Sequence, residues 1–186
     1  GNLAYDWEIG GKEAADAAFA AAAHITKLNM KNQRIIVNAM EPRAINALWD
    51  TEAEQWDIHT VSQGVTAMRR QLARQLGVDQ EKLRVRTPDV GGGFGMKLMN
   101  HPEYPVAALA AQRLGKPVKW TADRTESFLS DVQARELVTE AELALDADAK
   151  IIGIRVQSMS NLGAHYSQVG AAIHAMFSAG LYGTIY

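Results

Sequence analysis

The sequence predicts an α+β fold in which a mixed sheet is flanked by helices. Apolar residues recur at steps of three and four along one segment, as in an amphipathic helix, at Val65, Met68, Leu72 and Leu76. Two β-rich runs, 138–145 and 151–158, are joined by the acidic segment 146–150, which predicts an antiparallel hairpin. Shorter apolar runs at 83–87 and 118–122 indicate two further strands.

The amino-terminal third of the chain predicts one helix and several extended segments. Glu13–Ala23 is rich in alanine, the best helix former, and no proline interrupts it. The branched and apolar residues of His24–Val37 favour a strand or two. The proline within 41–44 biases that segment toward a loop. Turn residues follow at 49–55, and 56–61 alternates in polarity as a half-buried strand does.

Glycine and proline mark the boundaries of the helices. Gly77 is placed to end the amphipathic helix in a left-handed conformation. A second helix is predicted to begin near Pro102 and to run through Leu114. Asn100 or His101 is the expected cap of that helix.

Composition limits the classes of function. A chain of 186 residues with 47% hydrophobic residues can bury a core. Its net charge of −2 gives no electrostatic case for binding nucleic acid or anionic lipid. The absence of cysteine excludes disulfides, thiolate zinc sites and iron–sulfur ligation within this chain, and the scattered histidines do not predict a protein-ligated metal. No signal peptide or membrane span is expected.

The most informative stretch is the glycine loop, residues 88–97, in which Gly91, Gly92, Gly93 and Gly95 surround one aromatic residue. Glycine permits positive φ and lets a ligand approach the backbone amides closely. The loop matches neither nucleotide motif, because Met96 stands where a dinucleotide fingerprint and a phosphate loop both require glycine. A glycine-rich turn that only reverses the chain is the alternative.

Five short motifs occur in order around this loop: Thr60–Gln63, Leu83–Arg86, Pro88–Gly95, Lys116–Trp120 and Asp123–Arg124. Their order resembles the molybdenum-binding large subunit of the xanthine dehydrogenase and aldehyde oxidase family, and within it the carbon monoxide dehydrogenase type. The similarity runs from about Gly10 to Tyr186 but covers a minority of the family's large subunit. It implies that residues 1–186 are a partial molybdenum-cofactor-binding domain, with a subdivision near 123–135 and the flanking domains absent.

The resemblance assigns residues to the cofactor and the substrate. Gln63 would approach the oxo group of the molybdenum centre, because a neutral amide donates without adding charge. The amides of Gly92, Gly93 and Gly95, with Phe94 among them, would contact the pterin cofactor. The ring of Phe94 would also hold a flat substrate by offset stacking. Without this context, a solvated glutamine and a core phenylalanine would be the ordinary interpretations.

Three further positions qualify the assignment. Arg135 stands where xanthine-oxidising relatives place a substrate-orienting arginine, although a surface ion pair is the common fate of such a residue. Lys97 is expected near a phosphate or in solvent. Leu98 replaces a glutamate of the xanthine-type pattern, which argues against purines and favours an aldehyde or another aromatic heterocycle.

No catalytic residue is expected within this chain, because the general base of the family lies in a later part of the large subunit. Glu41, Glu103 and Glu126 are not substitutes, since nothing in their spacing joins them to the glycine loop, and an exposed position is expected for each. In the parent protein the resemblance implies oxidation of aldehydes or heterocycles with water as the oxygen source. The cofactor would be a molybdenum–pterin, for which bacterial relatives commonly use the cytosine dinucleotide form, and electrons would pass to iron–sulfur and flavin (FAD) partners.

A non-catalytic α+β interaction domain with a structural glycine loop is the competing hypothesis. The apolar final stretch, 161–186, hints at pairing into a homodimer. A cytoplasmic location is expected, or a periplasmic one if an export signal lies outside this sequence.

Overall fold

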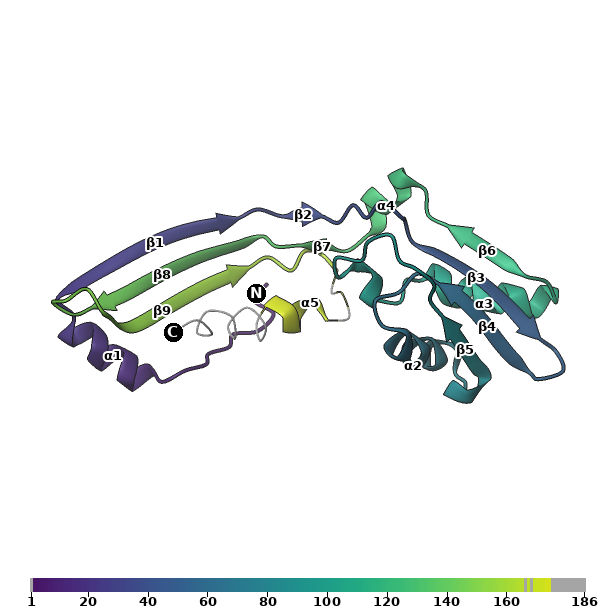
Figure 1. Ribbon diagram of the computed structural model, residues 1–186, viewed down its shortest axis with the longest axis horizontal. Coiled ribbons are helices and arrows are strands. Elements are labelled where there is room, and N and C mark those ends of the chain that lie inside the picture. The colour runs from purple at the N-terminus through teal and green to yellow at the C-terminus, as the bar shows by residue number, and fades with distance from the viewer. Residues whose placement is uncertain (1, 166, 168, 175–186) are drawn as a thin grey trace. The chain divides into compact units, whose positions relative to one another are not determined.

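The computed structural model describes residues 2–165, 167 and 169–174, and the final run of the sequence lies outside the described residues (Figure 1). The chain divides into two compact units: unit 2 is residues 36–133, and unit 1 combines 1–35 with 134–186. The chain passes between the units twice, at the paired short strands β2 (Ile35–Ile36) and β7 (Gln133–Ala134).

Unit 2 contains a four-stranded sheet in the order β5-β4-β3-β6. Its strands are β3 (Ala44–Asp50), β4 (Gln55–Thr60), β5 (Leu83–Arg86) and β6 (Val118–Thr121). β4 and β5 are parallel, whereas β3 is antiparallel to both β4 and β6. The sheet is therefore mixed and flanked by helices, as the sequence predicted.

Two helices cover one face of this sheet and form the core with it. They are α2 (Val65–Leu76) and α3 (Glu103–Leu114). Trp56 and Ile58 of β4 alternate with the more exposed Asp57 and His59, so every second side chain faces the helices. The alanines of α3 allow close approach, and Trp56 Nε1 donates to the Ala108 carbonyl at 2.9 Å. Gly77 ends α2 with φ 69°, in the predicted left-handed conformation.

The structure corrects two local predictions in unit 2. Segment 44–50 is the central strand β3, and the turn is confined to 51–54, where Asp50 Oδ1 accepts the amides of Glu52 and Ala53 at 2.9 and 3.0 Å. The alanines and asparagine of β3 have little strand propensity, so pairing on both sides decides its conformation. The cap predicted for α3 is also wrong: Pro102 occupies the N-cap position, without a side-chain cap bond.

The other elements of unit 2 are short. A 3₁₀ turn, η1 (Gln80–Lys82), precedes β5, and another, η2 (Met96–Leu98), follows the glycine loop. Helix α4 (Arg124–Ser130), which the sequence did not predict, begins where Asp123 Oδ1 accepts the amide of Glu126 at 2.7 Å.

Unit 1 contains a three-stranded antiparallel sheet in the order β1-β8-β9, with α1 (Lys12–Ala21) packed on β9. The strands are β1 (His24–Asn32), β8 (Leu137–Leu145) and β9 (Ile151–Ser160), followed by the short α5 (Gly170–Ala172). The predicted helix, the extended segment and the hairpin are all confirmed. Gly153 lets α1 approach, because a Cβ there would lie 3.0 Å from Ala18 Cβ.

Candidate cofactor-binding site

The glycine loop follows β5 in unit 2 and runs into η2. Within the loop Gly92 has φ 100°, Phe94 φ 52° and Gly95 φ 88°. The two glycines take these values without cost, but a left-handed conformation costs a residue with a Cβ about 1–2 kcal/mol. Phe94 therefore carries backbone strain that the surrounding contacts must maintain.

Gln63, immediately before α2, holds one end of the loop. Its side-chain Oε1 accepts hydrogen bonds from the main-chain amides of Gly95 at 2.9 Å and Lys97 at 3.2 Å. The main-chain amide of Gln63 donates to the Lys97 carbonyl at 3.1 Å. A Cβ on Gly93 would lie 2.4 Å from Gln63 Cδ, so the glycine leaves room for the carboxamide. Because Oε1 faces the loop, Nε2 is the end of the side chain that remains available as a donor.

Glu41 holds the other end. Its Oε2 accepts the Gly91 amide at 2.8 Å and the Lys97 ammonium at 2.9 Å, and its own amide donates to the Gly91 carbonyl at 3.1 Å. Burial opposes ionisation of Glu41, but the bonds from Lys97 and Gly91 hold its pKa below the ordinary value.

These contacts correct two expectations. Glu41 is not an isolated surface carboxylate but a partner of the glycine loop. Lys97 is neither solvated nor available for a phosphate, because its side chain is 0% exposed and its charge is paired with Glu41.

The middle of the loop offers donors without acceptors. Among the described residues, no group accepts the amides of Gly92, Gly93 or Phe94. The Phe94 side chain beside them is 74% exposed, and a Cβ on Gly92 would lie 2.8 Å from its ring. Unpaired amides at glycines that a Cβ would obstruct suit a large organic group that accepts hydrogen bonds from the backbone. The arrangement fits a pterin-type cofactor.

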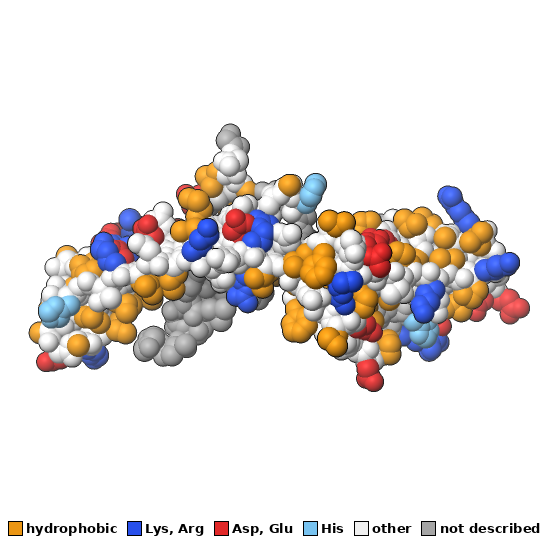
Figure 2. All heavy atoms as spheres, turned by 90° about the horizontal axis from the view of Figure 1, so that it is seen from above, with side chains coloured by type: hydrophobic (Ala, Val, Ile, Leu, Met, Phe, Trp, Pro, Cys, Tyr) orange, Lys and Arg blue, Asp and Glu red, His pale blue; other side chains and the backbone are white. Residues whose placement is uncertain are grey.

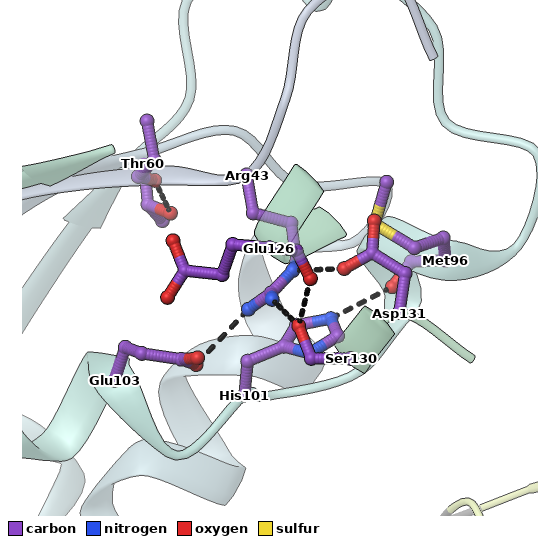
Figure 3. A network of polar contacts seen from close by, with 9 residues as sticks. Arg43, Thr60, Met96, His101, Glu103, Glu126, Ser130 and Asp131 are labelled. Atoms are coloured by element: carbon purple, nitrogen blue, oxygen red, sulfur yellow. Dashed lines mark hydrogen bonds and ion pairs between the residues drawn. The ribbon is translucent and has the colours of Figure 1, made fainter. Parts of the chain in front are cut away.

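A buried polar network adjoins the end of the loop at Met96 (Figure 3). Arg43, fully buried, donates to Glu103 at 3.0 Å and to Ser130 Oγ at 2.8 Å, and forms an ion pair with buried Asp131. Its guanidinium also lies 5.1 Å from the centre of the Trp120 ring. Glu103, expected to be exposed, is thus part of an ion-pair network that fixes the segment next to Glu41.

His101 joins this network to the loop. It is buried, and its Nε2 lies 3.2 Å from the Met96 carbonyl. Burial and the nearby Arg43 charge lower its pKa. The adjacent Asn100 donates to Gln75 Oε1 at 3.1 Å, which ties the segment after the loop to α2.

Arg124 anchors residues 38–40, which lead into Glu41 and also border the loop. Its guanidinium donates to Asn38 Oδ1 at 2.6 Å and to the Met40 carbonyl at 3.0 Å. Ala39 between them is buried and would lie 3.3 Å from a Cβ on Gly92. Half-buried Glu126 contributes its carbonyl to Ser130 Oγ at 2.7 Å.

Arg135 belongs to unit 1, whereas the residues described above belong to unit 2. It is exposed, and it and Glu136 both have positive φ, at 73° and 62°. Arg34 pairs with the Glu136 carboxylate and donates to the Asn161 carbonyl at 3.1 Å. The structure brings Gln63 and the glycine loop together, whereas the role of Arg135 toward a substrate stays a prediction.

Two classes of site receive no support. The described residues include no group of three or more histidine and acidic side chains placed to hold a metal, and no described helix is long and apolar enough to cross a membrane. Acidic and basic side chains are interspersed on the face shown in Figure 2, with no broad surface of one sign.

The fold and the glycine loop are those of a domain suited to hold a large organic cofactor. Residues 1–184 match the molybdopterin cofactor-binding domain, and the chain belongs to this family. This confirms the resemblance seen in the sequence.

The chain is also similar to individual proteins. The chain is 38% identical over 153 residues to the 6-hydroxypseudooxynicotine dehydrogenase complex subunit gamma of Paenarthrobacter nicotinovorans, covering 82% of this chain and 19% of that protein. It is 33% identical over 181 residues to the carbon monoxide dehydrogenase large chain of Hydrogenophaga pseudoflava, covering 97% and 22%. Among solved structures, quinoline 2-oxidoreductase from Pseudomonas putida 86 has a TM-score of 0.74 at 30% identity, covering 84% and 21%. The chain thus spans about a fifth of the length of these relatives.

Proposed function

We propose that this chain is the part of a molybdenum hydroxylase large subunit that holds the molybdenum–pterin cofactor. The observation that carries the proposal is the pairing of Gln63 Oε1 with two loop amides, beside three amides that have no acceptor among the described residues. A turn that only reversed the chain would not require a glycine at position 93, where a Cβ would lie 2.4 Å from Gln63 Cδ.

Each residue of the site has a defined part in this proposal. Nε2 of Gln63 would donate to the metal end of the cofactor, and the amides of Gly92, Gly93 and Phe94 would donate to its other acceptor atoms. The Gly95 amide already donates to Gln63, so its contribution is the left-handed turn that orients the loop. These donors are neutral dipoles, and the nearby charge of Lys97 is already paired with Glu41. They can stabilise an anionic group without a mobile side chain.

The bound cofactor would supply the redox chemistry, and the protein would position it and the substrate. We propose that the parent protein oxidises an aldehyde or an aromatic heterocycle with water as the oxygen source. Exposed Phe94 can stack on a flat substrate, and the name of quinoline 2-oxidoreductase describes an enzyme that acts on a heterocycle. Leu98 in place of a glutamate supports a substrate other than a purine.

Electrons would leave through iron–sulfur and flavin centres on partner subunits or domains, because these 186 residues contain no cysteine to ligate a cluster. One of the relatives is named as a subunit of a complex, which supports such an assembly. The 186 residues alone are expected to have no turnover, since the general base of the family lies elsewhere.

Cofactor analysis of the full-length parent protein tests this function. The protein is produced in a host that makes the cofactor, and its molybdenum and released pterin are measured beside the Gln63→Ala variant. Exposed Gln157 of β9, changed to alanine, is the matched control. We expect stoichiometric molybdenum and pterin in the wild type and the control, and a loss in Gln63→Ala. A wild-type protein that carries neither would favour the non-catalytic interaction domain.

A further inference from the structure

Glu41 reaches both ends of the glycine loop from a separate segment of the chain. Its Oε2 accepts the Gly91 amide before the unpaired donors and the Lys97 ammonium after them. The Gly91 carbonyl accepts the Glu41 amide in return, so that residue is held through both of its backbone groups. The loop is closed between two fixed points.

The approach of Glu41 is built into the sequence of the loop. A Cβ at Gly91 would lie 2.6 Å from Glu41 Cβ and 3.5 Å from its amide nitrogen, so a residue other than glycine would push the two segments apart. Arg43, two residues on, is fully buried in its own ion-pair network. Glu41 therefore extends from a fixed segment.

Lys97, the ion-pair partner of Glu41, is not accessible to solvent or to a ligand. The Lys97 side chain is 0% exposed, and its hydrogen bond within the described residues goes to Glu41 at 2.9 Å. A buried ammonium is stable only when it is paired, so this pair is maintained as a unit. The Lys97 backbone is simultaneously bound to Gln63.

The donors that need positioning lie between these two anchors. Gly92, Gly93 and Phe94 have no acceptors among the described residues, and Phe94 is held at φ 52°. A glycine loop released at one end could relax this strain and turn the amides toward its own carbonyls. Contacts at both ends prevent that collapse.

We propose that Glu41 and Lys97 are positioning residues for the cofactor, which keep the three free amides of the glycine loop directed at it. This inference rests on the proposed function. Neither side chain needs to touch the cofactor for this role, and the charge of Lys97 is used to fix the loop rather than to bind a phosphate.

The test compares Glu41→Gln, Lys97→Met and the double variant in the full-length parent protein. Glu54→Ala is the control, because Glu54 pairs with Lys82 at 3.1 Å on the exposed surface. The molybdenum and pterin retained after gel filtration are measured, together with the melting temperature of the cofactor-free protein. Retention and stability are thus recorded separately.

We expect Glu41→Gln to retain roughly tenfold less cofactor, or worse, in line with the loss of a residue that supports a metal site. It should also melt lower, because the ammonium of Lys97 stays buried without a counter-charge. The double variant removes that charge, so its melting temperature should recover while its cofactor retention remains low. Glu54→Ala should match the wild type in both.

Retention that recovers with stability in the double variant, or that is unchanged in Glu41→Gln, would overturn the positioning role while leaving the proposed function intact. A wild-type parent without molybdenum and pterin would instead overturn the proposed function, and this inference with it.

Discussion

The fit between Gly93 and Gln63 predicts a specific thermodynamic coupling. In Gly93→Ala the new Cβ would lie 2.4 Å from Gln63 Cδ and 2.7 Å from Oε1, so the glutamine must leave its place. Its two hydrogen bonds, at 2.9 and 3.2 Å, are then lost. At about 1 kcal/mol for each bond, unfolding should become easier by about 2 kcal/mol. Gly93 does not have positive φ, so left-handed strain adds nothing to the loss.

A double-mutant cycle isolates this effect. Gln63→Ala removes the same two bonds and also the overlap, so it should cost about 2 kcal/mol alone and Gly93→Ala should then cost little more. The free energy of unfolding can be followed by urea titration and tryptophan fluorescence, because Trp49, Trp56 and Trp120 all lie in unit 2.

The control is Gly77→Ala at the far end of α2, where φ is 69° and no atom lies within 4 Å of the new Cβ. It should cost about 1 kcal/mol through backbone strain and should add independently to Gln63→Ala. If Gly93→Ala and Gln63→Ala prove additive within about 0.5 kcal/mol, the packing of the carboxamide against the glycine is wrong.

Three further predictions follow from buried or strained groups. The pKa of His101 is lowered in the folded state, so the contribution of this residue to stability is complete above the unfolded value of 6.5 and is lost as the pH falls toward the folded pKa. Urea midpoints measured across this range should therefore decline less in His101→Gln than in the wild type. Burial raises the pKa of Tyr104 to about 12, so Tyr104→Phe should lack the loss of stability that the wild type shows between pH 10 and about 12. The buried hydroxyl lies beside the Thr60 side chain but makes no hydrogen bond of normal geometry among the described residues, so Tyr104→Phe should change the free energy of unfolding at neutral pH by less than about 1 kcal/mol; a larger loss would show that the hydroxyl is bonded. Arg34→Gln removes the ion pair with Glu136 and should weaken the hydrogen-exchange protection of β8 and β9. Adding Glu136→Gly should restore about 1 kcal/mol of the free energy of unfolding, because glycine relieves the left-handed strain at position 136. No recovery would mean that this strain is absent.

Elements with a strong local signal were predictable from the sequence. The apolar spacing and terminal glycine of α2, the alanine content of α1 and the hairpin of β8 and β9 all appear where their patterns placed them. Strand β3 was missed because Ala44, Asn46, Ala47 and Asp50 have little β-propensity, and pairing with two neighbouring strands decides its conformation. Pairing across the sheet is a tertiary effect that a local pattern does not contain.

The site was predictable in part, for the same physical reason. The glycines could be predicted as site residues because they permit unusual backbone conformations. Phe94 and Gln63 could be predicted from the order of the motifs in which they occur. Glu41, Arg43 and Arg124 were missed as supporting residues, because their partners are distant in sequence and a charged residue in a loop gives no sign that it is buried or paired. A proline between Glu41 and a fully buried arginine was the only local hint of a rigid segment.

If the main-chain donors of the glycine loop and Nε2 of Gln63 bind a molybdenum cofactor, the metal must lie beside them. Anomalous diffraction at the molybdenum absorption edge, from crystals of the full-length parent protein, would locate it. We expect a molybdenum peak beside Gln63, with the amides of Gly92, Gly93 and Phe94 directed at the cofactor. A peak remote from this loop, or loop amides paired with protein carbonyls in the loaded protein, would refute this role of the loop.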